Sequence, residues 1–310
     1  MKKLLPPLVI LMIISNFLAC NKEVKIAQSE QNPEIVIFDG NVVLKTQQDV
    51  NAFGAHNYSE INGSLSIEQD PNTTDVIRNL SVLNKLTKVK SLSITNNSEL
   101  ANLIGLDNLI SIGDSLKINQ NKFLTKLNLN KLDTINGWVS IFENNKLANL
   151  SGLDNLKFVN GYFSITTNPL LENLTGLNNL RKVEGTFRIY RNGGIRNLEG
   201  LNNLNTVNSS LIISSNSSLE DISQLNSLTS IAKTLSIGKN STLTTLSGLN
   251  HLSSVGENLS IKANTHLINF CALQTLLGTS GGLLGLYKVE RNAYNPTREQ
   301  IVAGECSSGK

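Results

Sequence analysis

Hydrophobic and polar positions along the chain follow a repeat of about 24 residues, and one copy runs from Tyr162 to Gly185. With Ile165 taken as the origin of this copy, Phe163 and Ile165 alternate with polar residues, as in a half-buried strand. Apolar residues then recur every third position, which suits short strands or 3₁₀ turns around a coil better than an amphipathic helix. These later apolar positions are Leu171, Leu174, Leu177, Leu180 and Val183.

The origin isoleucine recurs along most of the chain, and a polar residue follows it three positions later in each copy. Five consecutive intervals, from Ile141 to Ile261, are 24 residues long. Stacked asparagines that point inward would satisfy one another and the turn backbone, as buried amides require. The pattern therefore predicts a solenoid whose coils stack in register. The origins are Ile67, Ile94, Ile118, Ile141, Ile165, Ile189, Ile213, Ile237, Ile261 and then Val289, and the polar residues are Asp70, Asn97, Asn121, Asn144, Asn168, Asn192, Asn216, Asn240, Asn264 and Asn292.

We predict a right-handed β-solenoid of about ten coils of about 24 residues, with short capping helices at both ends. The chain divides into an N-terminal cap over 34–60, coils over 61–277, and a last coil with a C-terminal cap over 278–310. In the first cap, strands flank the Asp39–Gly40 turn and a helix follows from Thr46, its N-cap, to Phe53. In the second cap, Thr297 and Gln300 match a capping box.

The coil pattern also predicts local features. The residues two positions before each origin should form one buried ladder beside the asparagines. The first coil carries a small insertion between Asp70 and Asp75, and the third is one residue short between Leu127 and Leu132. Glycines before four strands should form tight corners with positive φ, namely Gly113, Gly137, Gly161 and Gly185.

The first 20 residues have the pattern of an export signal, which we assign to 1–19. Lys2 and Lys3 precede an apolar run from Leu4 to Ile14 that is too short to span a bilayer. Phe17–Cys20 resembles the lipobox of bacterial lipoproteins, so we expect a lipid on Cys20 and a flexible tether over 20–33. Ordinary cleavage beside an incidental cysteine is the alternative. The lipid would hold the protein in the bacterial cell envelope, with the outer membrane favoured and the side it faces left open.

The charge balance bears on the kind of partner, and the cysteine content bears on a disulfide. The formal net charge is +3, and 25 basic and 24 acidic residues remain once Lys2 and Lys3 are removed. A chain so close to neutral gives no electrostatic reason to expect a nucleic-acid partner.

Cys271 and Cys306 are the only cysteines after Cys20. In an exported chain we expect a disulfide between them, with two buried free thiols as the alternative.

The coil repeat and the two predicted caps resemble the receptor L domain, the leucine-rich-repeat-like solenoid of insulin- and growth-factor-receptor ectodomains. The resemblance covers about Val42 to Cys306 and is carried by a capping helix that ends at Phe53, by Ile61-x-Gly63-x-Leu65-x-Ile67, by the coil motif, and by a closing Asn292-x-Tyr294-Asn-Pro-Thr297 before Cys306. The closing segment is similar to the end of bacterial lipoproteins built on this module. The family has no shared active site, so the resemblance implies a binding surface and nothing narrower.

The residues that could carry catalysis or bind a metal show no known arrangement. His56, His251 and His266 lie at unrelated coil positions, and no His-x-x-x-His spacing occurs. A β-helical polysaccharide lyase would need charged residues gathered on one strand face to bind Ca²⁺ and remove a proton. The carboxylates are instead scattered over turns, so we expect no catalytic residue, metal site or cofactor.

One surface feature differs from the rest. Residues three before, one before and one after each origin should point outward, and most of them are small and polar. In the fourth to seventh coils this face gains aromatic, arginine and isoleucine side chains, which predicts a ligand-binding surface. Aromatic residues that only pack along a strand ladder are the alternative. The predicted binding residues are Trp138, Phe142, Tyr162, Arg188, Tyr190, Arg191 and Ile212.

Three functions therefore remain open from the sequence. The favoured one is a membrane-anchored, non-enzymatic envelope protein that binds a protein or glycan ligand through the strand face. The second is a glycan-active β-helical enzyme, which Ca²⁺-dependent turnover of an acidic polysaccharide would support. The third is a structural spacer without a ligand.

Overall fold

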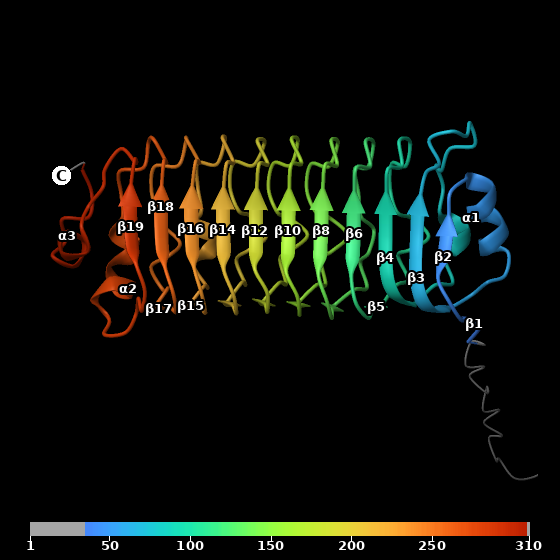
Figure 1. The fold of residues 1–310 in the computed structure, drawn as a ribbon, viewed down its shortest axis with the longest axis horizontal. Coiled ribbons are helices and arrows are strands. Elements are labelled where there is room, and N and C mark those ends of the chain that lie inside the picture. Colours follow the sequence, from blue (N-terminus) through green and yellow to red (C-terminus); the bar gives the residue numbers. More distant parts are fainter. Residues whose placement is uncertain (1–34, 309–310) are drawn as a thin grey trace, which may run out of the picture. The chain divides into compact units, whose positions relative to one another are not determined.

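The structure, a computed structural model, describes residues 35–308. These residues form a parallel β-solenoid, as predicted, whose coils follow one another in chain order (Figure 1). Every pairing between the described strands is parallel. Each coil buries one face of its strand, and the neighbouring coils supply the hydrogen bonds that a lone coil lacks.

One row of long strands runs through the whole solenoid, each strand paired with that of the next coil. The row begins inside the predicted N-terminal cap, because β2 pairs in parallel with β3 and does not form a hairpin with β1. The strands are β2 (Val42–Leu44), β3 (Glu60–Glu68), β4 (Lys88–Thr95), β6 (Leu116–Asn119), β8 (Val139–Phe142), β10 (Phe163–Thr166), β12 (Phe187–Tyr190), β14 (Leu211–Ser214), β16 (Leu235–Gly238), β18 (Leu259–Lys262) and β19 (Tyr287–Glu290).

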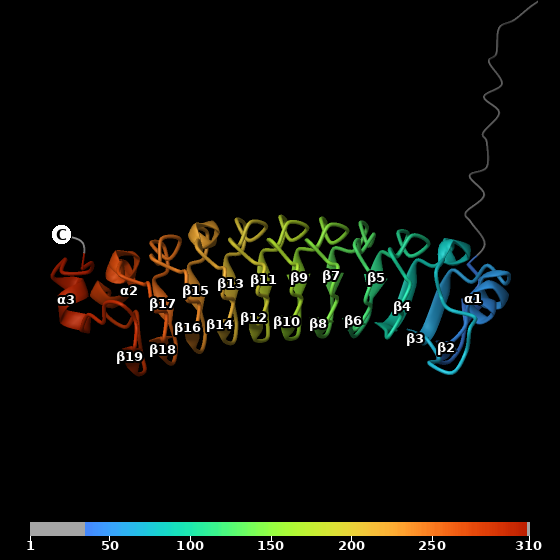
Figure 2. The ribbon, with the colours of Figure 1, turned by 90° about the horizontal axis from the view of Figure 1, so that it is seen from above.

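A second row of two-residue strands lies beside the first, and β3 and β4 take part in both rows (Figure 2). The short strands are β1 (Ile37–Phe38), β5 (Ser111–Ile112), β7 (Thr134–Ile135), β9 (Phe158–Val159), β11 (Lys182–Val183), β13 (Thr206–Val207), β15 (Ser230–Ile231) and β17 (Ser254–Val255). The helices are α1 (Gln47–Gly54), α2 (Gln274–Gly278) and α3 (Arg298–Val302), with 3₁₀ turns η1 (Ser81–Leu83), η2 (Ser223–Leu225) and η3 (Cys271–Leu273).

The predicted hydrophobic ladder is confirmed. Its members are at most 1% exposed and lie in register on successive strands, so each side chain packs on the equivalent one in the next coil. The rings of Phe163 and Phe187 stack with their centres 5.0 Å apart. The ladder consists of Leu92, Leu116, Val139, Phe163, Phe187, Leu211, Leu235 and Leu259.

The asparagine ladder is also confirmed, and Asn168 shows how it is built. Its side chain is fully buried, and Nδ2 donates to the carbonyls of Ile141 (3.0 Å) and Thr166 (3.1 Å) and to Oδ1 of Asn192 (3.2 Å). Its Oδ1 accepts from the backbone N–H of Asn144 (3.0 Å) and from Nδ2 of the same residue (3.3 Å). Each amide therefore connects its coil to the one before and the one after.

The two ends of this ladder differ. Asp70 was predicted to occupy the ladder in the first coil, but the insertion puts Gln69 in the buried place, where its Oε1 accepts a backbone N–H farther along the coil (2.6 Å). Asn97 Oδ1, the next along, has no hydrogen-bond partner among the described residues. At the other end, the N–H and Nδ2 of Asn292 donate to Asn295 Oδ1 (2.9 and 3.1 Å), which closes the ladder.

The short third coil is explained by one asparagine. Regular coils turn at a glycine such as Gly152 or Gly176, with φ of 110° and 109°. In the third coil Asn128 alone replaces this glycine and the residue before it, and its φ is 50°. Asparagine tolerates the left-handed region better than most residues, so a single position can complete the turn.

The predicted positive φ at the four corner glycines is wrong, since none of them adopts it. Backbone approach between coils is the reason for glycine at most of these corners. A Cβ on Gly161 would lie 2.7 Å from the carbonyl carbon of Gly137, and one on Gly185 would lie 2.5 Å from the Tyr162 nitrogen. Gly113 has more room, because its nearest neighbour would be 3.7 Å away.

The N-terminal helix matches its prediction. Thr46 Oγ1 accepts from Asp49 N–H (3.0 Å), and Asp49 Oδ2 accepts from the N–H groups of Lys45 (2.9 Å) and Thr46 (3.0 Å). The Lys45 N–H is the main reason that the pKa of Asp49 lies below its ordinary value. Gly54 is the last helical residue, and a Cβ there would lie 2.6 Å from the Val82 side chain. This contact fits α1 against the first coil.

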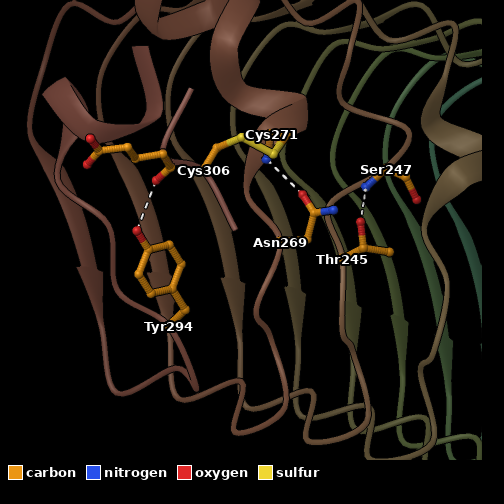
Figure 3. Close-up of a disulfide and its surroundings, with 7 residues drawn as sticks. Thr245, Ser247, Asn269, Cys271, Tyr294 and Cys306 are labelled. Carbon is orange, nitrogen blue, oxygen red and sulfur yellow. Dashed lines mark hydrogen bonds between the residues drawn. A yellow bond between two sulfur atoms is a disulfide. The ribbon is translucent and has the colours of Figure 1, made fainter. Parts of the chain in front are cut away.

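The C-terminal cap contains the expected disulfide between Cys271 and Cys306, with Cα atoms 4.8 Å apart (Figure 3). Asn269 Oδ1 accepts the Cys271 N–H (3.0 Å), and the Tyr294 hydroxyl donates to the Glu305 carbonyl (2.9 Å). The predicted capping box before α3 is present as well. The last coil is thus tied to the segment that covers it.

Candidate functional site

Every residue of the predicted binding surface lies on the outer face of the long strands or directly beside it. Between β4 and β18 no helix of residues 35–308 lies over this face (Figures 1 and 2). None of the seven predicted residues is in the core, because alternate strand positions point away from the buried ladder. Trp138, Phe142, Tyr190 and Ile212 are partly exposed, and Tyr162, Arg188 and Arg191 are exposed.

Trp138 and Tyr162 form a ring pair at the start of their strands. Each residue directly precedes its strand, and the 24-residue period places them on adjacent coils. Their ring centres are 5.4 Å apart and the planes differ by 6°. Tyr162 remains 45% exposed, although burial raises the pKa of its hydroxyl. Each ring covers one face of the other, and the exposed part of Tyr162 is available to a ligand.

Tyr190 lies between two arginines at the end of β12. Arg188 Cζ is 4.3 Å and Arg191 Cζ is 5.0 Å from the centre of its ring. Such cation–π contacts stabilise by roughly 0.5–1 kcal/mol each at exposed sites, and they restrict the guanidinium groups. In register beside Arg188 lies Ile212 on β14. Within residues 35–308 neither guanidinium group forms an ion pair, so both have donors for a carboxylate or sulfate.

The aromatic residues fall into two clusters at opposite ends of the strands. Trp138 and Tyr162 stand before their strands, whereas Phe142 and Tyr190 end theirs, about 13 Å along the strand direction. Between the clusters lie hydroxyl groups, and those of Ser164 and Thr166 are 2.8 Å apart. The surface therefore mixes rings, hydroxyls and guanidinium groups. Its role in binding stays a prediction.

The sequence interpretation missed a basic region on the same face, beyond β14. Lys239, Lys262 and Arg291 surround Gly238, at a coil whose outward residues are otherwise small and polar. Gly238 was the feature of the sequence that could have indicated this region. It stands one residue after an origin, where neighbouring coils carry a side chain, and a lysine follows it directly.

Two of the carboxylates that the sequence places on turns bind the backbone of those turns. Asp107 accepts the Gly105 N–H and Asp154 accepts the Gly152 N–H, both at 2.8 Å. The pKa of Glu184 is lowered by the Lys182 ammonium at 2.6 Å, which makes this carboxylate a weaker base. A general base works best with a pKa near the working pH.

The histidines and acids of residues 35–308 also form no metal site. No group of three or more His, Cys, Asp or Glu side chains in this region is placed to hold an ion. His251 Nδ1 lies 2.7 Å from the Asn226 carbonyl, and His266 Nδ1 lies 2.6 Å from the Ser241 carbonyl. Both exposed rings thus bridge to the preceding coil. This use agrees with a structural role.

Comparison with protein-family models, with curated proteins and with solved structures finds no match to this chain. Among the helices of residues 35–308, none has the length and apolar character needed to cross a membrane. The predicted signal peptide, Cys20 and the tether lie outside the described residues.

Proposed function

We propose that this protein is a lipid-anchored lipoprotein of the bacterial envelope that binds a protein or glycan ligand through its strand face, without catalysis. The observation that carries the proposal is a sheet face that no helix of residues 35–308 covers between β4 and β18. The stacked Trp138–Tyr162 pair and the Arg188–Tyr190–Arg191 cluster lie on it, partly or fully exposed. Trp, Tyr and Arg dominate the binding energy of known interfaces. Ring faces also suit sugars, and the arginines favour an acidic group.

The resemblance to the receptor L domain supports the same proposal. In receptors this module serves as a binding surface without chemistry of its own, and the solenoid here has the architecture that the resemblance implies. The proposal for the anchor rests on residues 1–20 of the sequence, with their basic start, apolar run and lipobox-like end. Its direct test is Cys20→Ser, which should release the protein from membranes and abolish metabolic palmitate labelling.

The binding proposal is tested with an array of envelope glycans and surface proteins. A Trp138→Ala/Tyr162→Ala variant should lose at least about 2 kcal/mol of binding free energy, with an unchanged melting temperature. Phe123→Ala/Phe158→Ala is the matched control, because both rings are exposed at positions outside this surface. Full binding by the first variant would reject the surface. An array that binds nothing would favour the spacer, and Ca²⁺-dependent turnover of an acidic polysaccharide would favour the enzyme.

A further inference from the structure

A hollow of about 310 Å³ lies on the outer face of β14, β16, β18 and β19. Its cause is a missing side chain. Gly238 stands in register between Ser214 and Lys262, at the strand-end position that Tyr190 holds on β12. Ala263, the smallest residue of the next row, widens the opening. Figure 1 places these strands in the same row as β8, β10 and β12, beyond β12.

The rim of the hollow is strongly basic. Lys239, Lys262 and Arg291 line it, and Glu290 is the only acid of residues 35–308 that does. The carboxylate of Glu290 lies 3.6 Å from both Lys262 and Lys288, so one negative charge is shared by two ammonium groups. Lys239 and Arg291 have no ion pair within residues 35–308. The site therefore carries excess positive charge that no acidic side chain of residues 35–308 neutralises.

Hydroxyl groups supply the other polar lining of the hollow. Ser214, Ser236 and Ser260 contribute to its walls, and Ser236 and Ser260 are in register on neighbouring strands. Hydroxyl, ammonium and guanidinium groups are all hydrogen-bond donors, so the lining matches a compact anion. Protein interfaces have large apolar or aromatic side chains at their centre. Among the lining residues only Ile237 is of this kind, and its side chain is fully buried in the core.

We propose that this hollow binds the carboxylate or sulfate groups of an acidic glycan. Lys239 and Arg291 hold the anion from two coils apart, about 10 Å across, and the serine hydroxyls bind the sugar beside it. This inference deepens the proposed function and rests on it, since the same strand face is the binding surface. It uses different residues, however. The hollow begins on β14, the strand that pairs with β12 and its Arg188–Tyr190–Arg191 cluster, so an extended chain of sugars can contact both.

The alternative anionic partners fit less well. An acidic protein would need apolar area for a stable interface, and the surroundings of the hollow provide mainly Ile212 and Leu286. A nucleic acid would need a longer basic surface, whereas Glu68 and Glu143 lie along the same strand ends toward the N-terminal coils. Both partners enter the test as separate probes.

The test measures binding of two probes, sulfated dextran and polygalacturonate oligosaccharides, to the soluble chain without its signal peptide. Lys239→Gln/Arg291→Gln should weaken binding by about tenfold to a hundredfold, since two charge-assisted contacts are lost. Gly238→Thr fills the hollow without a change of charge and should weaken binding by about tenfold. Its Cβ would lie 3.1 Å from the Lys262 carbonyl, so Ala263→Gln serves as a second filling variant. Lys126→Gln/Lys146→Gln, with the same charge change elsewhere, should stay within about twofold.

Each outcome decides between the claims. Loss in the hollow variants and in Trp138→Ala/Tyr162→Ala supports one continuous glycan surface. Loss in the hollow variants alone supports the anion site and rejects the aromatic pair. Loss in the aromatic variant alone, or equal loss in the lysine control, overturns the anion site. It is also overturned if neutral dextran binds as well as the acidic probes, if polyglutamate or single-stranded DNA binds more tightly, or if neither acidic probe binds.

Discussion

The asparagine ladder makes the sharpest prediction about stability, and Asn168→Ala tests it. The substitution removes a fully buried amide from the middle of the solenoid. The backbone N–H of Asn144 then loses its acceptor, and the carbonyls of Ile141 and Thr166 lose a donor. Asn144 Nδ2 loses its bond to Asn168 Oδ1 but keeps the one to the Ile118 carbonyl (2.8 Å). Asn192 Oδ1 loses one donor but still accepts the backbone N–H of residue 168.

The magnitude follows from what remains unsatisfied. A buried N–H without a partner costs about 1–3 kcal/mol, and each ordinary hydrogen bond that is lost costs about 0.5–1.5 kcal/mol. We therefore expect Asn168→Ala to lower the free energy of unfolding by about 2–5 kcal/mol. Asn179→Ala is the matched control. Asn179 Nδ2 also donates to a carbonyl of the preceding coil, that of Asp154 at 2.6 Å, but the bond is exposed to water. Its loss should cost less than about 1 kcal/mol.

The assay is denaturant unfolding of both variants, followed by circular dichroism and by Trp138 fluorescence. Two probes are needed because repeat arrays can unfold in parts, and a single free energy applies only if the transitions coincide. Asn168→Asp adds an independent check. Its carboxylate faces carbonyl oxygens, so its pKa should rise in the fold, and the variant should lose stability as pH rises through that pKa. Equal losses for Asn168→Ala and Asn179→Ala would refute the account of the ladder.

Three further predictions concern the core, the disulfide and the N-terminal cap. Leu177→Ala should lower the free energy of unfolding by about 2–5 kcal/mol in the same assay, whereas a change below about 1 kcal/mol would contradict its full burial. Cys271→Ser/Cys306→Ser opens a loop with a sequence separation of 35 and should cost about 4 kcal/mol; alkylation of the unreduced wild type should label neither thiol. Asp49→Asn should cost up to about 1 kcal/mol at pH 7, and the difference should vanish as pH falls through the lowered pKa of Asp49; a pH-independent difference would contradict this.

The fold was accessible from the sequence because the period fixes which residues meet. A 24-residue repeat places Phe163 beside Phe187 and Asn168 beside Asn192, whatever the path between them. The details that failed depend on departures from the period. The insertion in the first coil moves Gln69 into the place predicted for Asp70, and spacing alone gives no measure of that shift.

The candidate site was accessible only in part. The repeat predicts that Trp138 and Tyr162 are neighbours, and the stacked rings confirm the adjacency. The hollow at Gly238 could not be predicted in the same way. A missing side chain leaves a hollow only if the neighbouring side chains project from the sheet around it, and the sequence does not show how far they project. Likewise, the contact of Arg191 with Tyr190 depends on a backbone angle that residue types do not reveal.

The angle in question is the positive φ of Arg191, which recurs in nearly every coil and leads to a last prediction. The residue two after the origin has positive φ, between 54° and 60°, in nine coils, and none of the nine is glycine. The angle lets the residue donate to the next coil, as Thr167 does to the Tyr190 carbonyl (3.0 Å), before the asparagine turns inward. The residues are Asn96, Gln120, Glu143, Thr167, Arg191, Ser215, Lys239, Ala263 and Arg291.

A left-handed conformation costs an L residue about 1–2 kcal/mol, and β-branched Thr167 is the least suited of the nine. Thr167→Gly should therefore raise the free energy of unfolding by up to about 1.5 kcal/mol, after the entropic cost of glycine of about 0.5–1 kcal/mol. Ser164→Gly, in the strand of the same coil, should lower it by about 1 kcal/mol. If both variants are destabilised alike, the position is not strained. If Thr167→Gly is stabilising, side chains occupy this row at a cost to stability. The side chains of this row include Arg191, Lys239 and Arg291, which the two proposed binding regions require.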